Sequence, residues 1–188
     1  KPDQAYQESQ QIYLNYQKVI QMQFPALWNC DLCFNGGGSP TFTFHVSESV
    51  CNDLSFGSML LKPSDFESES LKSLQPALWI ATPVLKVLPF AQLPAMPLLN
   101  KLPHKSKALF IYGGYWLADY VYPNQCRPHL LYGRSSNQEL VNVSRNCDIQ
   151  VDDFVFLRPT QSEAILPQFS ELKLYKQHAF ETWQTFRE

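Results

Sequence analysis

The chain has 188 residues, of which 45% are hydrophobic, and a formal net charge of -2. This length fits one medium domain or one domain and a fragment, and the apolar content suffices for a buried core. The sparse, balanced charge argues against nucleic acid as the main partner, since such binding needs a basic face. The sequence has no basic amphipathic stretch, and a lysine and several prolines interrupt its most apolar segment, residues 76–99. We therefore predict neither membrane-surface binding nor a membrane span.

The five cysteines are odd in number and widely spaced, which is typical of a reducing compartment rather than of a disulfide framework. The first eleven residues are almost wholly polar and do not resemble a signal peptide. Together these features predict a cytoplasmic protein. Cys30 and Cys33 have C-x-x-C spacing but no partner pair follows. We expect them to be packed, with Cys33 in a buried strand, rather than to bind metal.

The clearest predicted helix covers Asp3–Gln23, where apolar residues recur at three- and four-residue spacing. Phe24-Pro25 ends this helix. Asp31–Asn35 is predicted to be a buried strand, and Gly36–Thr41 follows it as a glycine-rich turn. The order of helix, strand and glycine turn is typical of a β/α unit.

The character of the sequence changes after about Ser49. Ser64 and Glu67 are spaced as in a capping box, which predicts a short helix from Asp65 to Leu74. Many short apolar runs then alternate with turn-rich segments and indicate a barrel-like or sandwich β domain. The predicted strands are Leu78–Thr82, Val84–Leu88, Ala108–Tyr112, Asp153–Leu157, Glu171–Lys176 and Ala179–Phe186.

Two segments between the predicted strands have both a functional and a structural interpretation. Tyr112–Trp116 could wall a ligand site, but a β-bulge with packed aromatic rings is the favoured interpretation. Gly133–Asn142, which contains Arg134 and Glu139, offers polar groups that could reach a site or a partner subunit, but a solvent-exposed loop is the favoured interpretation. His45 is the histidine nearest the glycine turn, and we expect it to lie on a helix face rather than to act as a base.

These elements predict an α+β fold, with the last β/α unit of a barrel in residues 1–48 and a mostly antiparallel β domain in residues 49–188. A lone helix, strand and turn cannot bury a parallel strand, because such strands need cover on both faces. Residues 1–48 are therefore expected to be the end of a larger α/β body.

The glycine turn is the strongest candidate for a binding site. Its three glycines leave backbone N–H groups open to the approach of an anion. Ser39 suits the N-cap position and Pro40 the first helical position, so a helix is expected over Thr41–His45. A phosphate there would meet N–H donors, the positive end of the helix and two hydroxyl groups. A plain glycine-rich turn explains the same residues equally well, and the sequence lacks the lysine of a Walker A motif.

Several short motifs occur in a fixed order along the chain. Phe34–Thr41 reads Phe-Asn-Gly-Gly-Gly-Ser-Pro-Thr, and Asp53–Ser58 has an acidic-Leu-x-x-Gly-Ser pattern. Val151–Pro159, Gln168–Leu172 and Trp183 continue the series. In this order the motifs resemble the phosphate-binding turn and C-terminal β domain of fold-type III pyridoxal-phosphate enzymes. These enzymes form the alanine-racemase-like superfamily, and the nearest group is that of D-serine dehydratase and D-threonine aldolase.

The resemblance implies a TIM-type barrel whose strand ends hold pyridoxal phosphate, and a β domain that closes the site. It places the Schiff-base lysine on an early barrel strand upstream of Lys1. The chain is thus expected to be the C-terminal part of its parent, to need the N-terminal barrel portion and to be inactive alone. The resemblance further implies a small amino-acid substrate, most simply the D isomer, and a homodimer. The implied cofactor-binding residues are Gly36, Gly37, Gly38, Ser39 and Thr41.

One departure from the family pattern concerns metal binding. In the dehydratase and the aldolase, a His-x-Cys or His-x-Asp pair after a β-domain strand binds a divalent metal, and here Gln161 and Glu163 occupy those positions. An amide and one carboxylate are a poor ligand set for zinc, so we predict no metal site. Arg158, Gln161 and Glu163 become the candidate catalytic residues, with Arg158 pairing a substrate carboxylate. A solvated turn with an ordinary surface ion pair is the alternative.

The sequence therefore predicts the C-terminal portion of a pyridoxal-phosphate-dependent racemase or lyase. Loss of the metal pair favours chemistry other than dehydration. The alternative is a non-catalytic cofactor-binding or dimerisation module that retains the fold.

Overall fold

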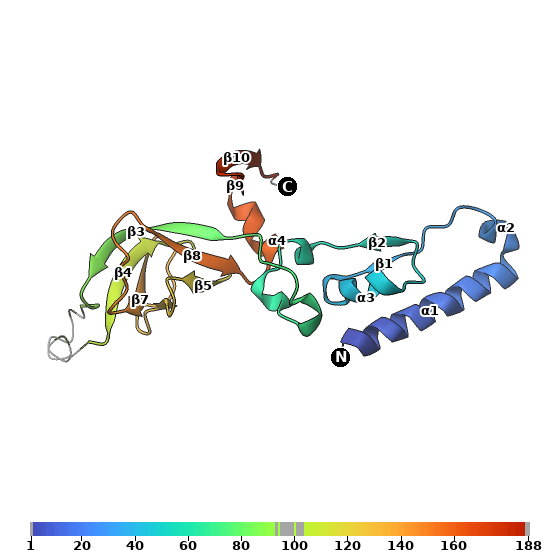
Figure 1. The fold of residues 1–188 in the computed structure, drawn as a ribbon, viewed down its shortest axis with the longest axis horizontal. Helices are drawn as coiled ribbons and strands as arrows, with labels where there is room; N and C mark the ends of the chain where they lie inside the picture. Colours follow the sequence, from blue (N-terminus) through green and yellow to red (C-terminus); the bar gives the residue numbers. More distant parts are fainter. Residues whose placement is uncertain (1, 93, 95–99, 101–103, 187–188) are drawn as a thin grey trace. The chain divides into compact units, whose positions relative to one another are not determined.

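The computed structural model describes residues 2–92, 94, 100 and 104–186. It divides into two compact units, Lys1–Ala77 and Leu78–Glu188, called here the N-terminal and the C-terminal unit. The N-terminal unit contains three α-helices and a parallel strand pair, and the C-terminal unit is built mainly from antiparallel strands (Figure 1). The boundary predicted after residue 48 lies inside the N-terminal unit. No helix of the described residues is long and apolar enough to cross a membrane.

Helix α1 (Pro2–Gln23) confirms the long helix expected from the sequence, and the short α2 (Pro25–Trp28) follows it. Polar side chains tie α1 to the rest of the N-terminal unit. The Gln10 side-chain oxygen accepts a hydrogen bond from the Val50 amide at 2.7 Å, and the Gln17 side-chain amide donates to the Val50 carbonyl at 3.1 Å. The Tyr13 hydroxyl donates to the Asn35 carbonyl. These contacts hold α1 beside the strand that precedes the glycine turn.

Strand β1 (Asn35–Gly37) pairs in parallel with β2 (Asp53–Ser55), with Gly36 opposite Leu54. The strand predicted over Asp31–Asn35 is wrong in position, because β1 begins where it was expected to end. The segment before β1 is held by a side chain instead of a strand ladder: Asn52 accepts a bond from the Phe34 amide and donates to the Leu32 carbonyl, both at 2.8 Å.

The glycine turn leads into a 3₁₀ turn, η1 (Ser39–Thr41), and then into α3 (Phe42–Ser47). A helix therefore forms where one was expected, over Thr41–His45. The N-cap residue of the preceding turn η1 is Gly38, however, and not Ser39 as expected. Further 3₁₀ turns follow β2, namely η2 (Ser58–Leu60), η3 (Ser64–Phe66) and η4 (Glu69–Leu71). The predicted capping box and helix from Asp65 to Leu74 are wrong, because Pro63 caps η3 and no side-chain capping bond forms.

The C-terminal unit contains a six-stranded antiparallel sheet in the order β5-β8-β3-β4-β7-β6. A separate hairpin of β9 (Glu171–Lys176) and β10 (Ala179–Gln184) follows α4 (Ser162–Ile165) and η6 (Leu166–Gln168). The predicted α+β class with a mostly antiparallel β domain is confirmed. The six strands are β3 (Ile80–Leu88), β4 (Ser106–Tyr112), β5 (Ala118–Tyr122), β6 (Arg127–Pro128), β7 (Gln138–Ser144) and β8 (Phe154–Pro159).

Strand β3 joins the two predicted strands on either side of Pro83 into one. Its first half pairs with β8, where Pro83 lies opposite Phe154, and its second half pairs with β4. A register shift between Val84 and Lys86 accompanies the change of partner. A proline is tolerated here because the strand changes neighbours and bulges at this point.

Strand β7 corrects the prediction of a solvent loop over Gly133–Asn142. Leu140 and Val141 are buried, and β7 pairs with β4 along its whole length. The short strands β5 and β6 were also not predicted. Tyr120 of β5 and Glu139 of β7 are hydrogen-bonded to each other, a pairing that periodicity alone does not reveal.

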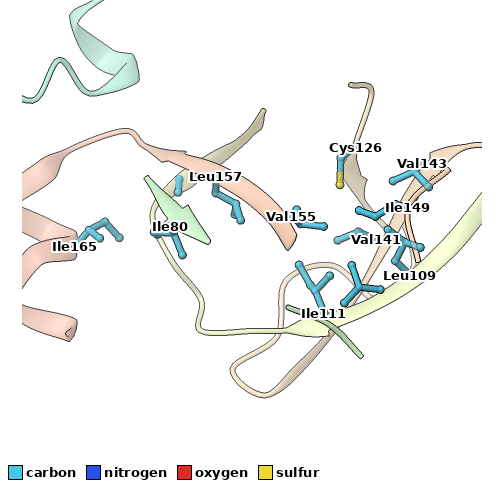
Figure 2. Packing of buried hydrophobic residues seen from close by; sticks show 12 residues of the cluster. Ile80, Leu109, Ile111, Cys126, Val141, Val143, Ile149, Val155, Leu157 and Ile165 are labelled. Atoms are coloured by element: carbon cyan, nitrogen blue, oxygen red, sulfur yellow. The ribbon is translucent and has the colours of Figure 1, made fainter. Parts of the chain in front are cut away.

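The core of the C-terminal unit lies between strands β3, β4, β7 and β8 (Figure 2). Its residues are apolar and at most 8% exposed. Trp116 and Phe169 pack against them, and the centroids of these two stacked rings are 6.0 Å apart. This packing of Trp116 agrees with the structural interpretation of Tyr112–Trp116, although Tyr115 itself is exposed. The labelled members are Ile80, Leu109, Ile111, Cys126, Val141, Val143, Ile149, Val155, Leu157 and Ile165.

Candidate functional site

The glycine turn offers an unused backbone donor at Ser39, just after β1. No hydrogen bond outside the helices and strand ladders of the described residues uses the Ser39 amide, whereas the parallel pairing of Gly37 with Ser55 directs the Gly38 amide toward the Ser55 carbonyl. The Thr41 amide, in contrast, donates to the Gly38 carbonyl at 3.0 Å and closes η1. A Cβ added at Gly38 would have one neighbour within 4 Å, the Thr41 hydroxyl oxygen at 3.8 Å, so the space beside Gly38 is open. The Ser39 amide and the open space beside Gly38 are therefore available to an anion.

The two hydroxyl groups of the turn already have protein partners. The Ser39 hydroxyl oxygen accepts a bond from the Met59 amide at 3.1 Å, and its proton remains able to donate elsewhere. The Thr41 hydroxyl donates to the Gly38 carbonyl at 3.2 Å. Ser39 is only 9% exposed but keeps a hydroxyl proton to donate, whereas Thr41 would have to exchange a long internal bond.

Gly37 is required for the geometry of the turn. Its φ of +108° is disfavoured for any side chain, and an added Cβ would lie 2.8 Å from the Ser55 carbonyl oxygen of the paired strand. The close approach of β1 and β2 thus depends on the absence of a side chain here.

Replacing Gly37 with alanine should destabilise the N-terminal unit by about 1–3 kcal/mol, from backbone strain and the contact with Ser55. Urea unfolding monitored by circular dichroism measures this change. Gly57→Ala is the matched control, because Gly57 has φ of -124° and an added Cβ meets nothing within 4 Å. Equal stability of the two variants would contradict the described pairing of β1 and β2.

His45 lies in α3 and is buried, as expected for a helix-face residue. Its Nδ1 lies 2.9 Å from the Ser49 hydroxyl, and its ring packs edge-on against Tyr6 with centroids 4.8 Å apart. Burial lowers the pKa of His45, so the neutral ring is favoured. Through its ring contact with Tyr6, His45 packs α3 against α1.

The three candidate catalytic residues belong to the C-terminal unit, and the glycine turn belongs to the N-terminal one. Arg158 is half-buried in β8, where it lies opposite Asp119 of β5. Gln161 and Glu163 are exposed at the beginning of α4, with Gln161 in the N-cap position. Arg158, Gln161 and Glu163 thus follow one another in the chain from the last residues of β8 to the start of α4.

A buried polar cluster of Tyr120, Arg134 and Glu139 was missed at the level of sequence. The Glu139 side chain is 1% exposed, accepts a bond from the Tyr120 hydroxyl and lies 3.6 Å from Arg134 Nη1. The Arg134 guanidinium stands 4.4 Å from the centre of the Tyr120 ring and donates to the Ala118 carbonyl. Burial raises the pKa of Glu139 to about 7, and a bond from the Ser135 amide opposes this effect. The apolar Leu140-Val141 pair after Glu139 was the one available signal of a strand.

The described residues contain no group of three or more His, Cys, Asp or Glu side chains that could hold a metal ion. All five cysteines are free thiols. The prediction that Cys33 lies in a buried strand is wrong, because Cys33 and Cys30 are both exposed. The Cys33 thiol lies 3.7 Å from an Asp53 carboxylate oxygen, a contact made by the irregular segment before β1.

Taken together, the chain is an α+β protein in which a short parallel strand pair carries a glycine turn and a separate antiparallel domain follows. Comparison with solved structures finds this arrangement in the crystal structure of D-threonine aldolase from Filomicrobium marinum, with a TM-score of 0.58 and 13% sequence identity. The match covers 97% of this chain and 48% of that one, so the chain spans about half the length of the aldolase. At this identity the likeness shows the fold. No family model and no curated protein matches the sequence.

Proposed function

We propose that this chain is the C-terminal portion of a pyridoxal-phosphate-dependent enzyme that acts on a small amino acid, most simply a D isomer, by lyase or racemase chemistry. The observations that carry the proposal are the unused amide of Ser39 and the open space beside Gly38. They lie at the end of a parallel strand, in a fold shared with a D-threonine aldolase. The motif resemblance of Phe34–Thr41 points to the same cofactor.

The residues of the turn fit a phosphate group. Ser39 would donate through its amide and its hydroxyl, and Gly38 leaves open space for the phosphate. Gly37 allows β1 to lie close to Ser55 of β2, and Gly36 lies close to Cys51. Thr41 would add a further contact by releasing its bond to the Gly38 carbonyl. No acidic residue belongs to the turn, so nothing within Gly36–Thr41 repels a doubly charged anion.

The N-terminal unit also presents the surfaces that the rest of a barrel would cover. Its sheet has two parallel strands, whereas parallel strands are normally covered by helices on both faces and flanked by further strands. Helix α1 exposes an apolar series in which Ile12 is 53%, Tyr16 65% and Met22 81% accessible. We infer that an N-terminal barrel portion packs against these surfaces and contributes the lysine that binds the cofactor.

When bound, pyridoxal phosphate supplies an electron sink for the carbanion at the substrate Cα. For this chain we propose three roles beyond holding the phosphate. Arg158 pairs the substrate carboxylate, as a planar guanidinium can do in bidentate fashion. Glu163 transfers a proton at the substrate, and Gln161 orients it by hydrogen bonding.

The test measures binding of pyridoxal phosphate and of pyridoxal, which lacks the phosphate, to the protein that carries this chain. We expect the phosphorylated form to bind more tightly in the wild type. Gly38→Asp should weaken pyridoxal phosphate binding about a hundredfold, because a carboxylate replaces open space beside the Ser39 amide and repels the phosphate. Pyridoxal binding should change little.

Gly38→Ala is the matched control, because it imposes the same backbone strain at φ of +133° without a charge. If Gly38→Asp and Gly38→Ala bind pyridoxal phosphate equally, the phosphate does not lie at this turn. If the wild-type protein binds neither compound, the cofactor assignment is wrong and a non-catalytic role of the fold replaces it.

A further inference from the structure

A cavity unrelated to the glycine turn lies within the C-terminal unit. It has a volume of about 560 Å³, within the range of roughly 300–1,000 Å³ that is usual for small-molecule sites. Its floor is formed by the neighbouring strands β3, β4 and β7. Its walls come from the chain after β3, represented by Ala91, and from the segment before β7, represented by Tyr132.

The floor is the face of the sheet opposite the hydrophobic core. Lys86, Phe110 and Leu140 lie side by side in one row across the three strands. Because successive side chains of a strand point to opposite faces, these residues face away from Leu109 and Val141, which belong to the core. The cavity therefore has its own apolar floor, to which Leu88 adds.

The charged residues in the described lining of the cavity are all cations. Its described lining contains two charged residues, Lys86 and Arg134, and no carboxylate. The Arg134 guanidinium is engaged by Glu139 and the Ala118 carbonyl. Lys86 is exposed, and no hydrogen bond or ion pair of the described residues uses its ammonium group. An unpaired cation thus stands at one end of an apolar floor, with the polar side chains of Gln138 and Ser135 also in the lining.

We propose that this cavity binds a small monocarboxylate with an apolar body. The hydrocarbon or ring covers Phe110, Leu140 and Leu88, and the carboxylate pairs with Lys86. Burial of the apolar body supplies affinity, and the single ammonium group selects an anion over a neutral or cationic molecule of the same shape. This site is independent of the proposed cofactor function, since none of its lining belongs to the N-terminal unit.

The probes are octanoate and its neutral counterpart octan-1-ol, titrated calorimetrically into the full chain. Octanoate should bind with one-to-one stoichiometry, about tenfold more tightly than octan-1-ol. Lys86→Gln should weaken octanoate binding about tenfold and leave octan-1-ol unchanged, since the charge pair is lost and the floor is kept. Phe110→Ala should weaken the binding of both probes.

Lys176→Gln is the matched control, because Lys176 is an exposed lysine of β9 outside the cavity. It should leave both affinities unchanged. The proposal is overturned if octanoate does not bind, if octan-1-ol binds as tightly, or if Lys86→Gln has no effect on octanoate while circular dichroism shows that the variant is folded.

Discussion

Replacing Arg134 with methionine is expected to lower the free energy of unfolding by about 3–5 kcal/mol at pH 8, and by much less at pH 5. Arg134 is the only cation in hydrogen-bonding or ion-pair contact with the buried Glu139 carboxylate among the described residues. Its loss leaves an uncompensated buried charge whenever Glu139 is ionised. At pH 5 the carboxyl group can take up a proton and remove most of that cost.

The sign of this pH dependence follows from the pKa of Glu139, which burial raises from 4.5 to about 7. A carboxyl whose pKa is higher in the folded state favours folding when protonated. Its contribution to stability is therefore fully present below about pH 4.5 and lost as the pH rises through 7. Removing the Arg134 charge, 3.6 Å from the Glu139 carboxylate, should raise the folded-state pKa further and extend the loss of stability to higher pH.

Urea unfolding of the wild type and Arg134→Met at both pH values measures the effect as a difference between the two proteins. Glu139→Gln supplies the control, because it removes the carboxylate. The double variant Arg134→Met/Glu139→Gln should lose less stability than Arg134→Met alone at pH 8, and its loss should be the same at both pH values. A loss for Arg134→Met that is the same at pH 5 and pH 8 would show that Glu139 is not the group responsible.

The elements that sequence reasoning predicted well depend on local patterns. Helix α1 follows from a three- and four-residue spacing of apolar side chains, and the β9–β10 hairpin from two short runs around a turn. The glycine turn was also found from sequence, because its conformation depends on residues adjacent in the chain. In each case the physical cause lies within a few neighbouring residues.

The elements that were missed depend on partners distant in sequence. Glu139 is charged and argues against a buried strand, yet Tyr120 and Arg134 satisfy it from other segments. In the same way, the Asn52 side-chain oxygen accepts the hydrogen bond from the Phe34 amide that a neighbouring strand would otherwise accept. Which amides of the turn remain free likewise depends on the pairing of β1 with β2. Sequence patterns show which groups are polar, but not which partners the fold brings to them.

A second large effect is expected in the core of the C-terminal unit. Leu109 is fully buried in β4, opposite Val87 on one side and Val141 on the other (Figure 2). Leu109→Ala removes its terminal carbons and leaves a cavity between strands that hold one another in register, so neighbouring side chains cannot collapse into it. The free energy of unfolding should fall by about 2–5 kcal/mol, measured by urea unfolding at constant pH.

Leu130→Ala makes the same chemical change at a side chain that is 95% exposed, and it should alter stability by no more than about 0.5 kcal/mol. The contrast between the two leucines isolates burial from the chemistry of the substitution. It also tests β7, the strand that the sequence did not predict: Leu109 is enclosed only if Val141 and Val143 face it across the β4–β7 ladder. Were β7 a solvent loop, Leu109 would be open on that side and the two variants would lose similar, small amounts of stability.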